Sequence, residues 1–172
     1  MKSPPLRLVN VTSYRVIYGD TDQMGVVYYA NYLRWFERGR SELLRQIGLP
    51  YPIIEQQGFH FPVVQVACRY TQSARYDEVI QIETELVEMG RASLSFRYRI
   101  WREADRCALA EGTTEHACTD HSGRVTRMPK ILLDALAAAL ILRMPRCSTQ
   151  NLDRRGNFFA SFAIALNLKP PL

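Results

Sequence analysis

The order of apolar and polar positions predicts a strand, then a long helix, then a series of further strands. Residues 13–19 alternate in two-residue steps, which is typical of a strand. From about Ala30 the apolar residues recur at three- and four-residue steps instead, and Gly48 followed by Pro50 signals the end of a helix of about 18 residues. The apolar stripe predicted for this helix consists of Tyr29, Leu33, Phe36, Arg40, Leu43, Leu44 and Ile47.

After a proline-containing link at residues 50–58, the pattern returns to strands. Because these strands follow one another through short turns, we expect an antiparallel sheet. One long helix and a curved sheet that wraps it make an α+β domain. The predicted domain spans residues 1–143, and residues 144–172 form a C-terminal extension with no motif and no role that the sequence defines. The later elements are strands over 61–70, 78–86, 92–100 and 108–119, and a helix over 131–143.

Composition places the chain among single-domain globular proteins. It has 172 residues, of which 47% are hydrophobic and 23% are charged. Its longest apolar stretches, 135–142 and 158–166, are far shorter than the ~20 residues of a membrane helix. No secretory signal stands out near the N-terminus. We therefore expect a cytoplasmic protein with no membrane span.

Charge and cysteine content narrow the possible partners. Lys and Arg number 22 against 17 Asp and Glu, which gives a net charge of +5, and nearly all the basic residues are arginine. Arginine suits phosphate groups, but here it is spread along the chain, so we expect no nucleic-acid partner. A phosphorylated cofactor or a genome that favours arginine codons explains the excess equally well. The four cysteines form no Cys-x-x-Cys pair, and we expect no metal site.

The junction between the first strand and the long helix carries the candidate chemistry. Asp20 and Asp22 precede a helix whose first N–H groups have no intrahelical partner. Such N–H groups bind a developing oxyanion, and a nearby carboxylate serves as a nucleophile or as the base for a water. Acyl-transfer hydrolysis needs a polarised carbonyl and a carboxylate that is placed to attack it or to activate a water. From these residues alone, an ordinary turn bonded by aspartate side chains is the favoured interpretation.

A family resemblance favours the catalytic interpretation. The stretch from Tyr18 to Arg38, YGDTDQMGVVYYANYLRWFER, resembles the signature of the 4-hydroxybenzoyl-CoA thioesterase family. The similarity continues through Phe61-Pro-Val-Val64 and Tyr70 to about Pro129. It implies the hot-dog fold, in which a long central helix is wrapped by a five- or six-stranded antiparallel sheet.

The same resemblance assigns roles within the site. It implies that Asp22 is catalytic and that the backbone N–H of Tyr29 polarises the thioester carbonyl. Asp20 is expected to cap the turn, and Glu37 to be a surface residue, although another branch of hot-dog enzymes uses a helical glutamate. The residues expected to contact substrate are Gly25, Val26, Pro62, Val63 and Val64, and packing in the core explains the last three equally well.

The implied activity is hydrolysis of an acyl-CoA to the free acid and coenzyme A. Coenzyme A enters as part of the substrate, so no separate cofactor is expected. The resemblance also implies a homodimer or homotetramer with pockets built across subunit interfaces. Alternatives are an acyl carrier protein thioesterase and a non-catalytic acyl-CoA-binding module; a hot-dog dehydratase is disfavoured because no histidine lies near the helix start. The face with Arg91, Arg97 and Arg99 either meets the phosphates of coenzyme A or is solvated.

Overall fold

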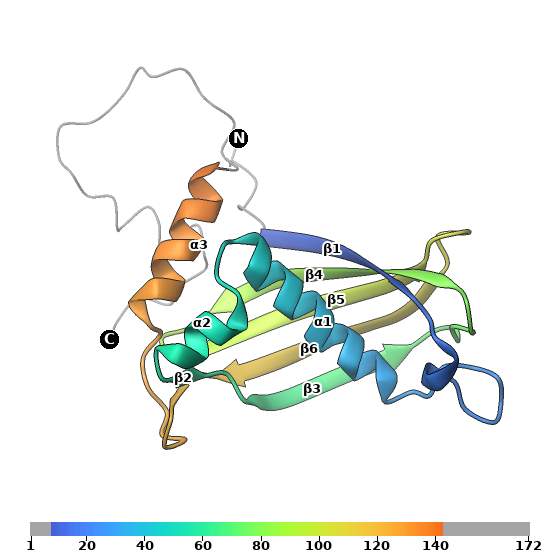
Figure 1. Cartoon of the computed structure of the whole chain (residues 1–172), viewed down its shortest axis with the longest axis horizontal. Helices are drawn as coiled ribbons and strands as arrows, with labels where there is room; N and C mark the ends of the chain where they lie inside the picture. Colours follow the sequence, from blue (N-terminus) through green and yellow to red (C-terminus); the bar gives the residue numbers. More distant parts are fainter. Residues whose placement is uncertain (1–7, 143–172) are drawn as a thin grey trace, which may run out of the picture.

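A long helix lies across one face of a curved antiparallel sheet (Figure 1). The computed structural model describes residues 8–142, so the predicted extension at 144–172 lies outside the described residues. The elements in chain order are β1 (Leu8–Arg15), a 3-10 turn η1 (Tyr18–Asp20), α1 (Asn31–Gln46), α2 (Tyr51–Gln56), β2 (Phe59–His60), β3 (Val63–Tyr70), β4 (Val79–Met89), β5 (Ser93–Arg102), β6 (Ala108–Ala117), β7 (Thr119–Asp120) and α3 (Lys130–Leu142).

The main sheet has five strands in the order β1-β4-β5-β6-β3, and every neighbouring pair is antiparallel. Strand β3 follows the helix in sequence but pairs with β6 at the far edge, so the chain crosses the sheet between β1 and β3. The short strands β2 and β7 form a separate pair. The α+β class and the five antiparallel strands are as predicted.

Helix α1 packs closely on the sheet because one of its buried positions has no side chain. A Cβ atom at Gly39 would lie 2.1 Å from Thr84 Oγ1 on β4, which no real contact allows. One turn earlier, the ring of Phe36 stacks on Tyr98 of β5 with centroids 4.3 Å apart. Gly39 therefore sets how near the helix approaches, and the aromatic pair fills the space beside it.

The predicted end of the helix is confirmed. Gly48 has φ +78°, the left-handed conformation that glycine adopts without strain. The Leu49 N–H donates to the Leu44 carbonyl at 3.0 Å, and the Gly48 N–H donates to the Arg45 carbonyl at the same distance. These two bonds are the Schellman arrangement that satisfies the last carbonyls of a helix.

Three details of the sequence prediction are wrong. The first strand covers Leu8–Arg15 and gives way to the turn η1, because its partner strand β4 begins at Val79, opposite Arg15. The link at 50–58 contains helix α2, whose Pro52 lies in the first turn, where a missing N–H costs nothing. The buried stripe of α1 is shifted, since Leu33 is exposed and the buried residues are Tyr32, Trp35, Phe36, Gly39, Leu43 and Leu44.

None of the helices within residues 8–142 combines the length and the apolar character that crossing a membrane requires.

Candidate active site

The segment from residue 16 to residue 30, which we call the helix-start loop, is a small antiparallel turn held by backbone hydrogen bonds. Asp22 N–H donates to the Val26 carbonyl and Tyr28 N–H donates to the Asp20 carbonyl, both at 2.9 Å. The chain reverses through Gly25, whose φ of +71° explains the glycine at that position. Both predicted aspartates therefore lie on one arm of the turn, and the start of α1 follows the other.

Asp20 anchors this loop, as the sequence predicted for a turn cap. Its side chain is 5% exposed, and one carboxylate oxygen accepts hydrogen bonds from Tyr14 Oη at 2.8 Å and from the Ile17 N–H at 3.2 Å. Its backbone carbonyl accepts from Asn31 Nδ2 at 2.9 Å. One residue thus joins β1, the loop and the first residue of α1, so its role is structural.

Asp22 is held differently and keeps acceptor capacity. Its Oδ1 accepts the Met24 N–H at 2.8 Å, while Oδ2 has no partner among residues 8–142. The side chain is half-buried. The pKa of Tyr28 is raised, chiefly by hydrogen bonding with the Tyr29 side chain and in smaller part by the negative charge of Asp22. The Asp22 carboxylate therefore lies beside the aromatic pair that precedes the helix.

Two backbone N–H groups at the start of α1 are available to a ligand. The Asn31 N–H donates to the Tyr28 carbonyl at 2.9 Å, which closes a turn around Tyr29 and Ala30. Among residues 8–142, no group accepts from the N–H of Tyr29 or of Ala30. Consecutive N–H groups at a helix start point outward along its axis, and the helix dipole adds partial positive charge there. This end of the helix therefore suits a developing oxyanion.

Tyr70, at the end of strand β3, contacts the peptide unit between Tyr29 and Ala30. Its hydroxyl donates to the Tyr29 carbonyl at 3.0 Å, and its ring packs edge-on against the rings of Tyr29 and Tyr32. No local sequence pattern assigns Tyr70 a role, because residues 41 positions apart reveal their contact only through the pairing of β3 with β6.

The residues predicted to contact substrate divide into two groups. Gly25 and Val26 belong to the helix-start loop. Pro62, Val63 and Val64 lie at the opposite end of β3 from Tyr70, and at ~3.3 Å per residue this separation is about 20 Å. Within one chain, the structure therefore does not bring these three residues to Asp22.

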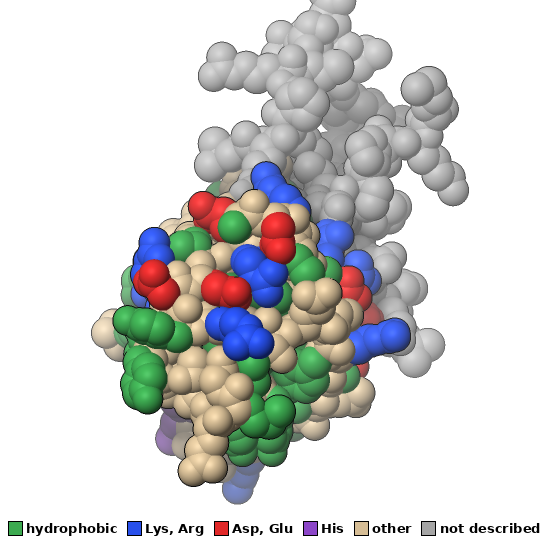
Figure 2. Space-filling model, turned by 90° about the vertical axis from the view of Figure 1, so that its right-hand side faces the viewer, with side chains coloured by type: hydrophobic (Ala, Val, Ile, Leu, Met, Phe, Trp, Pro, Cys, Tyr) green, Lys and Arg blue, Asp and Glu red, His purple; other side chains and the backbone are tan. Residues whose placement is uncertain are grey.

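The end of the molecule that carries the helix-start loop exposes several large apolar side chains (Figure 2). Met24 is 81% exposed and Tyr29 is 60% exposed. A monomer gains nothing from such exposure, and clustered exposed apolar residues mark ligand or protein contacts. Others on the loop are Tyr18 and Tyr28.

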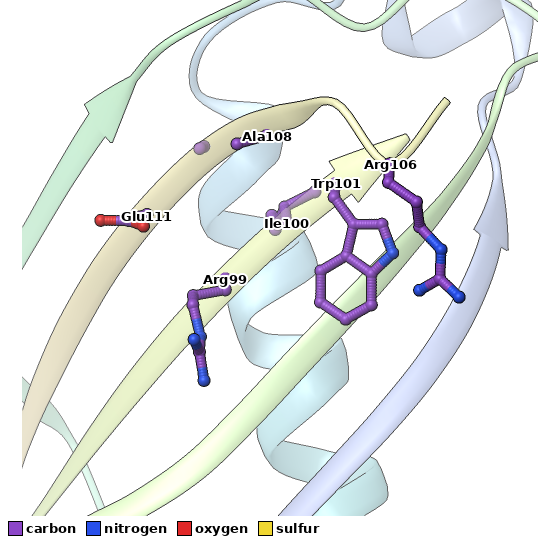
Figure 3. A pocket seen from close by; sticks show the side chains of 7 residues that line it. Arg99, Ile100, Trp101, Arg106, Ala108 and Glu111 are labelled. Carbon is purple, nitrogen blue, oxygen red and sulfur yellow. The ribbon is translucent and has the colours of Figure 1, made fainter. Parts of the chain in front are cut away.

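A cavity of about 290 Å³ lies elsewhere, on β5 and β6 (Figure 3). Arg99 and Trp101, which line it, alternate with the buried Ile100, so the cavity opens on the face away from α1. Arg99 forms an ion pair with Glu83, and Arg97 approaches Glu85 to 3.6 Å. Two of the three predicted phosphate-binding arginines therefore already have acidic partners. Within residues 8–142, no three His, Cys, Asp or Glu side chains are grouped to hold a metal.

Comparisons with known proteins relate this chain to thioesterases. The profile of the thioesterase-like superfamily matches residues 16–140. The acyl-CoA thioesterase YbgC of Haemophilus influenzae is 38% identical over 107 residues, which cover 62% of this chain and 77% of that protein. The 4-hydroxybenzoyl-CoA thioesterase of Pseudomonas sp. strain CBS-3 is 31% identical over 91 residues, 51% of this chain and 64% of that protein. The crystal structure of a hypothetical protein from Thermus thermophilus superposes with a TM-score of 0.70 at 40% identity, covering 74% of this chain and 97% of the other.

The chain belongs to the thioesterase-like superfamily. The family resemblance and the hot-dog fold predicted from the segment between Tyr18 and Arg38 are thereby confirmed, and so is thioester hydrolysis as the class of reaction. The comparisons assign no individual site residues.

Proposed function

We propose that this protein hydrolyses acyl-CoA thioesters at the helix-start loop, with Asp22 as the catalytic carboxylate and the Tyr29 N–H as the oxyanion donor. The observation that carries the proposal is the pairing, in one hydrogen-bonded loop, of an aspartate oxygen and two N–H groups that have no partner among residues 8–142. The names of related proteins support coenzyme A as the carrier.

The reaction follows from these groups. The thioester carbonyl oxygen accepts a hydrogen bond from the Tyr29 N–H, which stabilises the negative charge that forms when the carbonyl carbon is attacked. In one route Asp22 attacks directly, releases the thiolate of coenzyme A and forms a mixed anhydride that water then cleaves. In the other, Asp22 takes a proton from the attacking water. Both routes end in a free acid and coenzyme A, and neither needs a separate cofactor.

The test is the Asp22→Asn variant, assayed by thiol release from acetyl-, palmitoyl- and benzoyl-CoA. We expect kcat to fall by ~10²–10⁴-fold, the usual contribution of a general base, with an unchanged melting temperature. The matched control is Glu37→Gln, because Glu37 is an exposed carboxylate on α1 and should leave the rate unchanged. Near wild-type turnover by Asp22→Asn, or a large loss in Glu37→Gln, would contradict the assignment.

The proposed enzyme is a homo-oligomer that pairs through the β3 edge. Within the described part of the chain, residues 8–142, this strand has no partner on its outer edge, and it exposes apolar side chains, with Val63 51% and Val64 62% exposed. Edge strands of this kind invite pairing with another chain. Antiparallel pairing of two β3 strands about their centre places Val63 of the partner subunit opposite Tyr70. The predicted substrate contacts that lie far from Asp22 within one chain then reach the site of the neighbouring subunit.

Solution mass tests this arrangement. Val66→Lys puts a charge at the centre of β3, and we expect light scattering to show dissociation together with loss of activity. Val11→Lys is the matched control, since Val11 is 49% exposed on β1 at the other edge of the sheet. A monomeric wild-type protein with full activity would contradict the proposal.

The proposal also covers the carrier of the acyl group and the cellular compartment of the enzyme. Because Arg97 and Arg99 are paired with glutamates on the outer face, they give an acidic carrier protein little to bind. We expect faster turnover of acyl-CoA than of the same acyl group on acyl carrier protein, measured side by side. The free thiols of Cys68, Cys107 and Cys118 suit the reducing cytoplasm, where we place the enzyme.

A further inference from the structure

Tyr70 links the edge strand β3 to the peptide that precedes the central helix, and neither route of the proposed reaction uses it. Its hydroxyl donates to the Tyr29 carbonyl at 3.0 Å. The same carbonyl accepts the Tyr32 N–H at 3.3 Å, and the Tyr70 ring lies edge-on to Tyr32 with centroids 5.1 Å apart. The Tyr29 carbonyl is therefore held by one hydrogen bond from the first turn of α1 and by another from strand β3.

That carbonyl and the Ala30 N–H belong to the same planar peptide unit and point in opposite directions. Fixing the carbonyl of Tyr29 therefore fixes the direction of the Ala30 N–H. A carbonyl that accepts hydrogen bonds also polarises its peptide, so the N–H becomes a stronger donor. Within residues 8–142 this N–H has no acceptor, and neither does the N–H of Tyr29 next to it.

We propose that Tyr70 is a positioning residue whose hydroxyl orients the Tyr29–Ala30 peptide, so that the Ala30 N–H gives the thioester oxygen a second hydrogen bond. The inference rests on the proposed function, since it places the thioester carbonyl at the helix start. Burial raises the pKa of Tyr70, so its hydroxyl stays protonated and remains a donor. A donor aimed at an oxyanion contributes more in the transition state than in the bound substrate, so Tyr70 acts on kcat rather than on KM.

The Tyr70→Phe variant removes the hydroxyl and keeps the ring. With whichever of acetyl-, palmitoyl- and benzoyl-CoA the wild type hydrolyses fastest, we expect kcat to fall about ten-fold and KM to stay within about two-fold, the scale of one hydrogen bond. Tyr76→Phe is the matched control: its ring also packs edge-on against a tyrosine, Tyr18, and its hydroxyl has no partner among residues 8–142. Melting temperature and solution mass should be unchanged in both variants.

A spectroscopic measurement separates positioning from a structural role. With the same acyl-CoA, labelled with ¹³C at the carbonyl and bound to Asp22→Asn protein, the carbonyl stretching frequency reports the hydrogen bonds that the oxygen accepts. Adding Tyr70→Phe should raise this frequency, and adding Tyr76→Phe should leave it unchanged.

The outcomes are distinguishable. A wild-type protein that releases no thiol from any substrate of the panel overturns the proposed function and this inference with it. An active wild type whose Tyr70→Phe and Tyr76→Phe variants share the same kcat overturns the role of Tyr70 alone. A Tyr70→Phe variant that loses stability and activity together, with an unshifted carbonyl frequency, makes Tyr70 merely structural and also overturns it.

Discussion

Helix α1 joins two regions of opposite character. Its first residues follow the helix-start loop, where two N–H groups and one oxygen of Asp22 have no partner among residues 8–142 and large apolar side chains are exposed. Its middle turns cover the sheet core, where Phe36, Tyr98 and Phe96 are each at most 1% exposed. The loop keeps its polar groups available, and the core buries its aromatic rings.

The difference implies that activity and stability respond to different substitutions. In the core, every side chain is fixed by its neighbours, so a change of volume alters the free energy of unfolding. In the loop, the Asp22 side chain is held by one hydrogen bond from a turn N–H within residues 8–142, so its chemistry can be removed with little effect on folding. Substitutions in each region therefore test this separation.

Phe36→Ala should have the largest effect on stability. It removes the ring that stacks on Tyr98 and leaves a cavity under the middle of α1. We expect the free energy of unfolding to fall by about 3–5 kcal/mol in chemical denaturation, while kcat per folded molecule is kept. A variant that stays fully stable but is inactive would reverse the comparison.

Acid should weaken the core through His116. This residue is fully buried, with Nδ1 bonded to the Phe61 carbonyl at 2.9 Å and Nε2 to Thr114 Oγ1 at 2.8 Å. Burial lowers the pKa of His116 from 6.5 to about 4. The folded state thus binds its proton less readily than the unfolded chain, so the stability is complete above pH 6.5 and is lost as the pH falls toward 4, by about 3 kcal/mol in all.

His116→Gln checks this origin. Glutamine does not titrate, so the variant should be less stable at neutral pH, yet its stability should change less between pH 6.5 and 4 than that of the wild type. Equal pH dependence in the two proteins, measured by denaturation at each pH, would exclude His116 as the source.

Gly39→Ala tests how closely the helix lies on the sheet. Alanine ordinarily favours a helix over glycine by ~1 kcal/mol. Here its Cβ meets Thr84 Oγ1, and we expect a net loss of about 2 kcal/mol from overpacking. Gly48→Ala, at a left-handed position with open space, is a useful contrast because its cost comes from backbone strain alone. A stabilised Gly39→Ala protein would show that the helix can move away freely.

Asp20→Asn should have the smallest effect, and it should lower both the stability and the activity. Asparagine keeps one acceptor oxygen for Tyr14 and for the Ile17 N–H but loses the charge that strengthens those bonds. We expect a loss of about 1 kcal/mol together with a modest fall in kcat, because the loop also positions Asp22. A rate loss as large as that of Asp22→Asn would mean that Asp20 takes part in the chemistry.

Patterns within short stretches of the sequence predicted most of the elements. The alternation over 92–100 and the glycine and proline after α1 placed strand β5 and the helix end correctly, because both depend on local backbone geometry. Helix α2 was missed because Pro52 was interpreted as part of a link, although a proline is compatible with a first turn. The aspartates of the loop were found because two carboxylates before a helix start are a local feature.

The chain alone determined the alternating faces, the helix with its stop signal, and the loop that holds Asp20 and Asp22, since each depends on neighbours a few residues away. The tertiary structure decided which aspartate is buried in a hydrogen-bond network, and it brought Tyr70 onto the Tyr29 carbonyl. It also placed Pro62 and Val63 at the end of edge strand β3 that lies far from Asp22. Those outcomes depend on strand order, which is set by packing between segments that are distant in sequence.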